Sequence, residues 1–178
     1  MKKSIYKLLI LIILIILSYN VFTILYKNIE NKVEISSYIN NPTSYNNYYK
    51  GMLYIPKIDL KTTIKKANKD YSNLDNSLVY YKDLNTNNRI IIFGHSGAGY
   101  GTYFSRINEL KNGEKAYLYH QNYVHEYTVY DIKKINETDL SILNDTKNKE
   151  ELYLVTCIKN DKKSRLVIKL RQKSVKKA

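Results

Sequence analysis

The chain has no tryptophan, one cysteine and three histidines among its 178 residues. A single cysteine excludes an intrachain disulfide and leaves a free thiol. The histidines are His95, His120 and His125. With only one cysteine beside them, the sequence offers few candidate ligands for a zinc site. We therefore expect no metal and no cofactor, and the one thiol, Cys157, needs another explanation.

The charge of the chain does not single out a nucleic-acid partner. Hydrophobic residues make up 44% and charged residues 25%, which is typical of a globular domain. The formal net charge is +13, but the lysines are spread along the chain. This spread favours a solvated basic surface over a nucleic-acid groove, and it leaves anionic lipid or a wall polymer as partners for the charge.

The N-terminal region carries no charge from residue 8 to residue 25. As a helix this run is about 27 Å long, close to the hydrocarbon thickness of a bilayer. No site of small residues for signal cleavage follows it, so we expect an uncleaved membrane anchor. Lys2, Lys3 and Lys7 precede the run, which predicts a cytoplasmic N-terminus with the rest of the chain outside the cell.

The rest of the chain divides into a linker and one domain. Residues 28–50 are rich in Asn, Ser and Tyr and lack a clear period, which predicts a stalk. The predicted organisation is therefore a cytoplasmic tip and anchor at 1–27, a stalk at 28–50 and a folded domain at 51–178.

Short segments rich in β-formers run through the predicted domain, separated by turn signals such as the Asn-rich stretch 84–88. The predicted strands are 52–58, 62–67, 78–81, 89–93, 115–119, 124–134, 151–156 and 166–171. Helical stretches are short, at 70–74 and 103–110, so a parallel βαβ fold is not expected. Eight strands without long helices predict an all-β, closed or nearly closed barrel.

Cys157 ends an apolar run, and Arg165 opens the next one after the polar turn 159–163. Alternation along the second run directs Leu166, Ile168 and Leu170 to the core. Arg165 then lies on the outer face or at the mouth of the strand. A lone cysteine is most often a small buried hydrophobe, but this one ends its strand, where solvent reaches it.

His95 follows the buried run 90–93 and opens a loop with glycines at 94, 97, 99 and 101. The loop matches neither a Walker A sequence nor a dinucleotide fingerprint. It does not match a serine-hydrolase elbow either. A cysteine, a histidine and an arginine can together perform acyl transfer, as nucleophile, acid/base and oxyanion-stabilising group. The spacing alone does not decide between this catalytic role and two simpler interpretations. In these, the histidine only makes hydrogen bonds within its own loop, and the arginine is an ordinary surface residue.

Three segments together resemble the sortases, the membrane-anchored cysteine transpeptidases of Gram-positive cell surfaces. They are GMLYIPKIDLKTTI at 51–64, FGHSGAGYGTYFSRINELKNGE at 93–114 and LYLVTCIKNDKKSRLVIKL at 152–170. The shared pattern is Gly-His after a strand, Thr-Cys at a strand end and an arginine on the next strand. The resemblance covers roughly residues 51–171, and the compact domain is similar to class A or class D members.

The resemblance implies a closed eight-stranded β-barrel and a specific reaction. Cys157 would attack the Thr-Gly-type bond of an LPxTG-like sorting signal and form a thioester. An amine from a cell-wall precursor or a pilin lysine would then resolve it. His95 would be the acid/base and Arg165 the oxyanion or substrate-positioning group, while Thr156 and Ser96 would contact substrate.

The resemblance also implies that residues 136–151, before the cysteine strand, form a lid over the sorting signal. Some sortases use calcium, but the spacing of the acidic residues in this region does not predict a site. These residues are Glu137, Asp139, Asp145 and Glu150. His120 and His125 are expected to be structural or exposed.

Two alternatives remain open beside transpeptidation. A hydrolase would use the same three residues, with water replacing the amine. A non-catalytic, membrane-anchored module would bind wall polymer through its basic surface and would not need Cys157.

Overall fold

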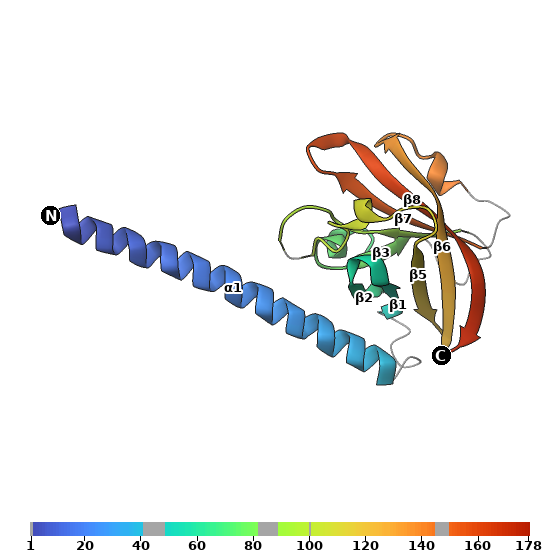
Figure 1. Cartoon of the computed structure of the whole chain (residues 1–178), viewed down its shortest axis with the longest axis horizontal. Helices are drawn as coiled ribbons and strands as arrows, with labels where there is room; N and C mark the ends of the chain where they lie inside the picture. Colours follow the sequence, from blue (N-terminus) through green and yellow to red (C-terminus); the bar gives the residue numbers. More distant parts are fainter. Residues whose placement is uncertain (1, 41–48, 82–88, 100, 145–149) are drawn as a thin grey trace.

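The computed structural model describes residues 2–40, 49–81, 89–99, 101–144 and 150–178. The predicted turn at 84–88 and the acidic residue Asp145 lie outside these ranges. One long helix precedes a set of strands, and short 3₁₀ turns lie in some of the connections between the strands (Figure 1). The helix is α1 (Lys2–Asn40), and the strands are β1 (Tyr49–Ile55), β2 (Leu60–Lys66), β3 (Leu78–Tyr81), β4 (Ile90–Phe93), β5 (Lys115–His120), β6 (Tyr123–Asn136), β7 (Glu151–Ile158) and β8 (Asp161–Lys177). The 3₁₀ turns are η1 (Pro56–Ile58), η2 (Ser72–Asn76), η3 (Ile107–Glu109) and η4 (Ser141–Leu143).

The strands close into a barrel in the order β1-β2-β3-β4-β7-β8-β6-β5. Neighbours are antiparallel except for two pairs, β2 with β3 and β4 with β7, which are parallel. The predicted closed eight-stranded barrel is confirmed. The parallel pair of β4 and β7 matters most for the site, because it brings the C-terminal ends of two distant segments to the same rim.

Alternation along β8 places its side chains as predicted. Ile168 and Leu170 are fully buried in the barrel core, and Leu166 packs against the same cluster. Val167 belongs to a second apolar cluster with Val155, on the opposite face of β7 and β8. The strands around Cys157 therefore have an apolar surface on both sides.

Several predicted boundaries were wrong for identifiable reasons. The strand predicted at 52–58 ends at Ile55, because Pro56 has no N–H for the ladder and instead begins η1. The predicted helices at 70–74 and 103–110 are single 3₁₀ turns. The strand predicted at 166–171 is far longer, since β8 pairs with β6 through its polar ends, where no alternation signals a strand.

Helix α1 continues well beyond the apolar run, to Asn40 in the predicted stalk. It is long and apolar enough to cross a membrane, and no side chain of its apolar part is buried in the described chain. The later part lies along β1 and β2, where Tyr38 is buried. The segment predicted as a stalk is thus helical and docked on the barrel as far as Asn40.

Candidate active site

Strand β7 lies between β4 and β8 in the barrel. This order brings the ends of β4 and β7 and the start of β8 together at one end of the barrel. In the parallel ladder Phe93 is opposite Val155, so the chain leaves both strands at the same level. Two residues beyond this pair are His95, in the loop after β4, and Cys157, near the end of β7. Two segments separated by about sixty residues in sequence therefore meet because their strands are parallel neighbours.

The arginine is placed from the other side of β7. Cys157 and Arg165 are direct partners in the antiparallel ladder of β7 and β8. The turn between the strands explains the eight-residue spacing seen in the sequence. Cys157 is exposed. The loop with His95 follows the neighbouring strand β4, and Arg165 lies on the other neighbouring strand, β8.

A short set of hydrogen bonds fixes the loop after β4 to the end of β7. Thr156 is buried, and its hydroxyl donates to the carbonyl of Gly94 at 2.7 Å. The amide of Gly94 donates to the carbonyl of Val155 at 3.2 Å. One residue further, the hydroxyl of Ser96 donates to the carbonyl of Cys157 at 2.5 Å. The backbone around the thiol is therefore tied to the backbone around the histidine.

Gly94 is required by its surroundings. A Cβ at this position would lie 2.5 Å from Leu78 Cδ2 and 2.7 Å from Phe104 Cδ2. The chain passes so close to the core here that only glycine fits. This close approach sets the direction in which the loop presents His95.

An acidic residue from η2 contacts the histidine. His95 Nε2 lies 3.1 Å from Asp75 Oδ1. Gly101, with φ of +79°, packs so tightly on the carbonyl of Asp75 that a Cβ would clash with it. The sequence did not point to Asp75, because its contact with His95 exists only once η2 packs against the glycine-rich loop.

Arg165 is held by its own turn and by one carboxylate. Its Nη1 donates to the carbonyl of Lys162 at 2.8 Å and to that of Ser164 at 3.1 Å. Its Nη2 donates to Glu137 Oε2 at 3.1 Å. Glu137 thus serves as the partner of Arg165. Among the described residues there is no group of three or more metal-ligating side chains.

One groove contains all three predicted catalytic residues. It has a volume of about 340 Å³, and His95, Cys157 and Arg165 all line it. Its remaining lining is largely apolar and comes from η4, the end of β6 and the outer face of β4 and β7. A second hollow of about 400 Å³ lies on the other side of Cys157, beside Ser96, Ser105 and Lys159. Thr156 borders both. The groove can hold an extended peptide segment against the thiol, and the hollow leaves the thiol open to a second reactant.

The other two histidines lie away from this groove. His125 is in β6, where its Nδ1 lies 2.9 Å from Gln172 Oε1. His120 ends β5, next to the turn of Gln121 and Asn122. Neither contributes to the lining of the groove or the hollow beside Cys157.

Comparison with known proteins identifies the family. A family model described as a sortase domain matches residues 53–173. The chain is 32% identical to sortase D of Bacillus subtilis over 110 residues, which is 60% of this chain and 53% of that protein. It is 27% identical to sortase A of Bacillus anthracis over 120 residues, 66% of this chain and 57% of that protein. These alignments span about half the length of the curated relatives.

Solved structures share the fold. The chain superposes on sortase A of Listeria monocytogenes with a TM-score of 0.65 at 24% identity, covering 74% of this chain and 91% of the other. For the sortase D5 transpeptidase of Clostridium perfringens the TM-score is 0.67 at 19% identity, covering 81% and 98%. These neighbours show that the chain has the closed barrel fold of these sortase structures. The chain belongs to the sortase family.

Proposed function

We propose that the chain is a membrane-anchored cysteine transpeptidase that cleaves an LPxTG-like sorting signal and transfers the released acyl group to an amine. One observation carries the proposal. Cys157, His95 and Arg165 come from three different segments and line one groove that is large enough for a few peptide residues.

The apolar part of the groove supports an extended, partly apolar peptide as substrate. Its lining includes Leu140, Ile142 and Leu143 from the segment predicted as a lid, together with Phe93 and Val155 from β4 and β7. A leucine and a proline in the sorting signal would bury their side chains here. The scissile carbonyl would then lie at the thiol, where the groove becomes polar.

The first half-reaction forms a thioester. The Cys157 thiol gives its proton to His95 and its sulfur adds to the carbonyl carbon. The Arg165 guanidinium and the Cys157 N–H stabilise the oxyanion. The C–N bond then breaks. His95 gives its proton to the departing amine, so the leaving group departs as a neutral amine. The acyl group remains bonded to sulfur, and the C-terminal peptide leaves.

The second half-reaction reverses these roles with a new amine. His95 takes a proton from the incoming nitrogen as this attacks the thioester carbon. The C–S bond breaks, a new amide forms and Cys157 is regenerated. The hollow beside Ser96 and Lys159 supports access from the side opposite the sorting-signal groove. The amine would come from a wall precursor or a pilin lysine.

The helix supports a location at the cell membrane. We propose that the apolar part of α1 spans the bilayer with Lys2, Lys3 and Lys7 on the cytoplasmic side. The barrel would then lie outside the cell, where surface proteins and wall precursors are found.

The experiment is a peptide assay with the full chain in detergent micelles. A set of LPxTG-like peptides is incubated with and without an added amine, oligoglycine or a lysine peptide, and the products are separated by liquid chromatography and mass spectrometry. The proposal predicts an amide product with the added amine, and none from Cys157→Ala. Cleavage to a free acid alone, whatever the amine, would identify a hydrolase instead.

The alternative, a non-catalytic binding module, predicts a different result in the same peptide assay. It predicts no cleavage by the folded chain and salt-sensitive polymer binding that is equal in the native chain and Cys157→Ala. A variant far from the groove, Ser174→Ala, is the matched control for loss of a small polar side chain.

A further inference from the structure

The membrane helix is joined to the barrel by polar contacts as well as by the chain. Asn31 Nδ2 donates to the carbonyl of Lys61 at 3.1 Å, and its Oδ1 accepts from the Thr62 hydroxyl at 2.9 Å. One turn on, Glu34 accepts from the Thr63 hydroxyl and from Lys65 Nζ, both at 2.9 Å. The ion pair of Glu34 and Lys65 is mostly shielded from water.

A buried tyrosine forms the last contact along the helix. Tyr38 is 5% exposed, and its hydroxyl donates to the carbonyl of Tyr119 at the end of β5. Burial raises the pKa of Tyr38 to about 12. Asn31, Glu34 and Tyr38 recur at helical spacing on one face, so a single stripe of α1 holds the barrel.

These contacts fix which end of the barrel is nearer the apolar run of α1. Ile24, Lys27 and Asn28 border a crevice of about 180 Å³ whose opposite wall includes Gly99 and Tyr103 of the loop after His95. The distal contact of α1, at Tyr38, is with the opposite end of the barrel, beside the C-terminus of the chain. In Figure 1 the C-terminus lies near the C-terminal end of α1, and the turn between β7 and β8 lies at the other end of the barrel.

The length of α1 leaves little room between a bilayer and the end of the barrel that carries the glycine-rich loop. A helix of 39 residues is about 58 Å long, and a hydrocarbon core of about 30 Å takes up roughly 20 residues of it. The apolar run ends near residue 25. The glycine-rich loop after His95 lies beside residues 24–31, where the helix leaves the hydrocarbon.

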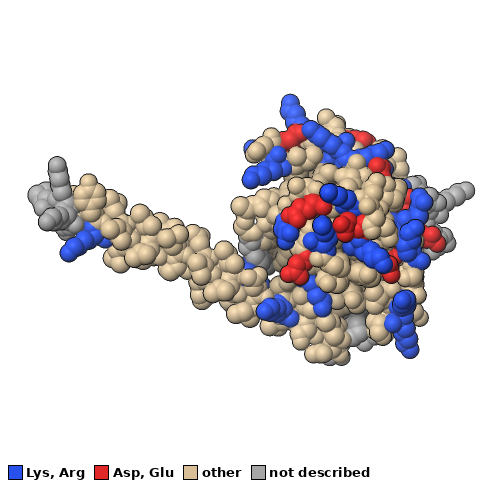
Figure 2. Space-filling model, viewed as in Figure 1, with Lys and Arg blue, Asp and Glu red and all other residues tan. Residues whose placement is uncertain are grey.

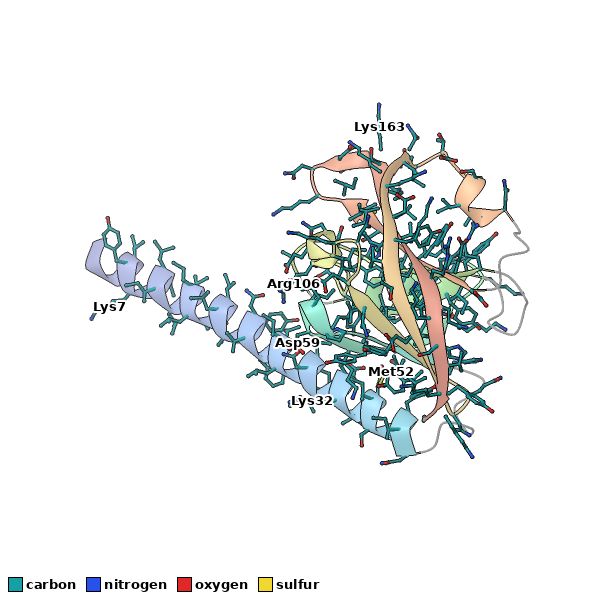
Figure 3. The ribbon with its side chains drawn as sticks, turned by 45° about the vertical axis from the view of Figure 1, so that its right-hand side comes forward. Lys7, Lys32, Met52, Asp59, Arg106 and Lys163 are labelled. Carbon is teal, nitrogen blue, oxygen red and sulfur yellow. The ribbon has the colours of Figure 1, made fainter. Side chains whose placement is uncertain are left out.

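The turn between β7 and β8, at the same end of the barrel as Cys157, carries three exposed lysines. They are Lys159, Lys162 and Lys163, and no carboxylate of the described chain lies within 4 Å of any of them. Figure 2 shows Lys and Arg side chains at this end of the barrel, as over the rest of the visible face, and Figure 3 shows Lys163 at its extremity. Unpaired lysines close to a bilayer are attracted by anionic headgroups.

We propose that the barrel is held with its Cys157 end against the membrane and that Lys159, Lys162 and Lys163 bind anionic lipid headgroups there. Each lysine contributes about a fivefold factor to the equilibrium between a barrel in contact and one lifted away. The inference rests on the proposed membrane span of α1 but not on the chemistry at Cys157. It goes beyond anchoring, because it assigns the orientation of the active site and a lipid-binding surface.

A wall polymer is a less suitable partner for these three lysines. The docked helix keeps the turn at the level of the membrane surface, where headgroups are the densest anions within reach. The same rim would then meet substrates whose transmembrane or lipid parts hold them in the same bilayer.

The test uses the single cysteine of the full chain. A fluorophore is attached to Cys157 in vesicles of phosphatidylcholine with or without phosphatidylglycerol. Quenching by lipids with a nitroxide on the headgroup reports how close the label is to the membrane surface. The reference is Cys157→Ser/Lys173→Cys, labelled on β8 at the opposite end of the barrel. The labelled Cys157 chain is then compared with K159Q/K162Q/K163Q and with a matched triple, K173Q/K176Q/K177Q.

We expect stronger quenching at Cys157 than at Lys173→Cys, and a further increase with phosphatidylglycerol. That increase should disappear in K159Q/K162Q/K163Q and persist in the matched triple. Equal quenching at the two ends, or equal loss in both triples, would overturn the proposal. Binding of soluble polyphosphate through the same lysines, with no effect of phosphatidylglycerol, would overturn it in favour of a wall polymer.

The membrane span is checked separately in the same vesicles. Resistance of the chain to alkaline carbonate extraction is expected for a spanning helix. Extraction of the chain would contradict both the span and the orientation. Retention with equal quenching at both ends would overturn the orientation alone.

Discussion

At the residue scale, Arg165 illustrates how one side chain is kept ready beside the thiol. Two backbone carbonyls and Glu137 fix its guanidinium, and the ladder sets it opposite Cys157. The planar fork has donors for these partners and for an oxyanion at the same time. Lysine offers one compact charge and cannot reproduce this arrangement.

Arg165→Lys should therefore lower kcat for peptide cleavage about 10²- to 10³-fold, the usual effect of removing one oxyanion donor. Glu137→Gln keeps a hydrogen-bond acceptor and should change kcat less than about tenfold. Steady-state kinetics of both variants would check this. Near-native activity of Arg165→Lys would contradict a role for Arg165 in the reaction.

Thr156 links the cysteine strand to the histidine loop. Thr156→Val keeps the shape but leaves the buried carbonyl of Gly94 without its 2.7 Å hydrogen bond. We expect a loss of about 1–3 kcal/mol in the free energy of unfolding. Activity should fall by more than the folded fraction explains, because His95 loses part of its support. Thr138→Val, on an exposed turn, is the control, and an unchanged melting curve for Thr156→Val would contradict the account.

At the element scale, β7 connects catalysis and stability. Its last residues carry Thr156 and Cys157, while its first residue, Glu151, is 6% exposed. Arg89 Nε donates to Glu151 at 2.9 Å, and the Tyr130 and Tyr153 hydroxyls donate at 2.7 and 3.2 Å. One strand thus has a buried carboxylate at its start and an exposed thiol near its end.

The Glu151 carboxylate should make stability depend on pH. Burial raises its pKa, but the hydrogen bonds from Tyr130 and Arg89 outweigh burial and lower the pKa below the ordinary 4.5. The folded state therefore binds the proton less readily than the unfolded state, so this contribution is fully present above pH 4.5. This contribution is lost as the pH falls through the lowered pKa that Glu151 has in the folded state.

The measurement is the free energy of unfolding of the native chain and of Glu151→Gln from neutral to acidic pH. The difference between them should stay constant near neutrality and shrink below pH 4.5. The neighbouring exposed residue provides the control for loss of one carboxylate, Glu150→Gln. A difference that is independent of pH would contradict the assignment.

The sequence predicted the strands that alternate and the residues that the family pattern marks. Leu166, Ile168 and Leu170 reached the core as expected, and the three predicted catalytic residues line one groove. The sequence could not predict that β8 extends to Lys177, because the polar residues at its ends show no alternation and pair with β6 only in the folded barrel. Nor could it predict the partners Asp75 and Glu137, which approach the site only through tertiary packing.

At the scale of the whole molecule, α1 and the barrel form one body. The contacts of Glu34 with Thr63 and Lys65 predict that reversing a single charge weakens the docking. Glu34→Lys should increase hydrogen exchange in residues 28–40 and in β2, corresponding to about 1–3 kcal/mol of lost protection. The double variant Glu34→Lys/Lys65→Glu should recover much of it.

Lys32→Glu serves as the control for docking, because Lys32 is exposed on the same helix. It should leave exchange in β2 unchanged. Equal exchange in the native chain and Glu34→Lys would mean that residues 28–40 do not dock, and the orientation of the barrel would then be free.

The central claim, acyl transfer through Cys157, has a direct test in the intact mass of the protein. The full chain is kept reduced in detergent, mixed with LPxTG-like peptides and measured before any amine is added. We expect an added mass equal to the N-terminal part of one peptide, removed by hydroxylamine and absent in Cys157→Ala. No added mass with any peptide, on protein whose circular dichroism shows it to be folded, would contradict the account, as would an adduct that persists in Cys157→Ala.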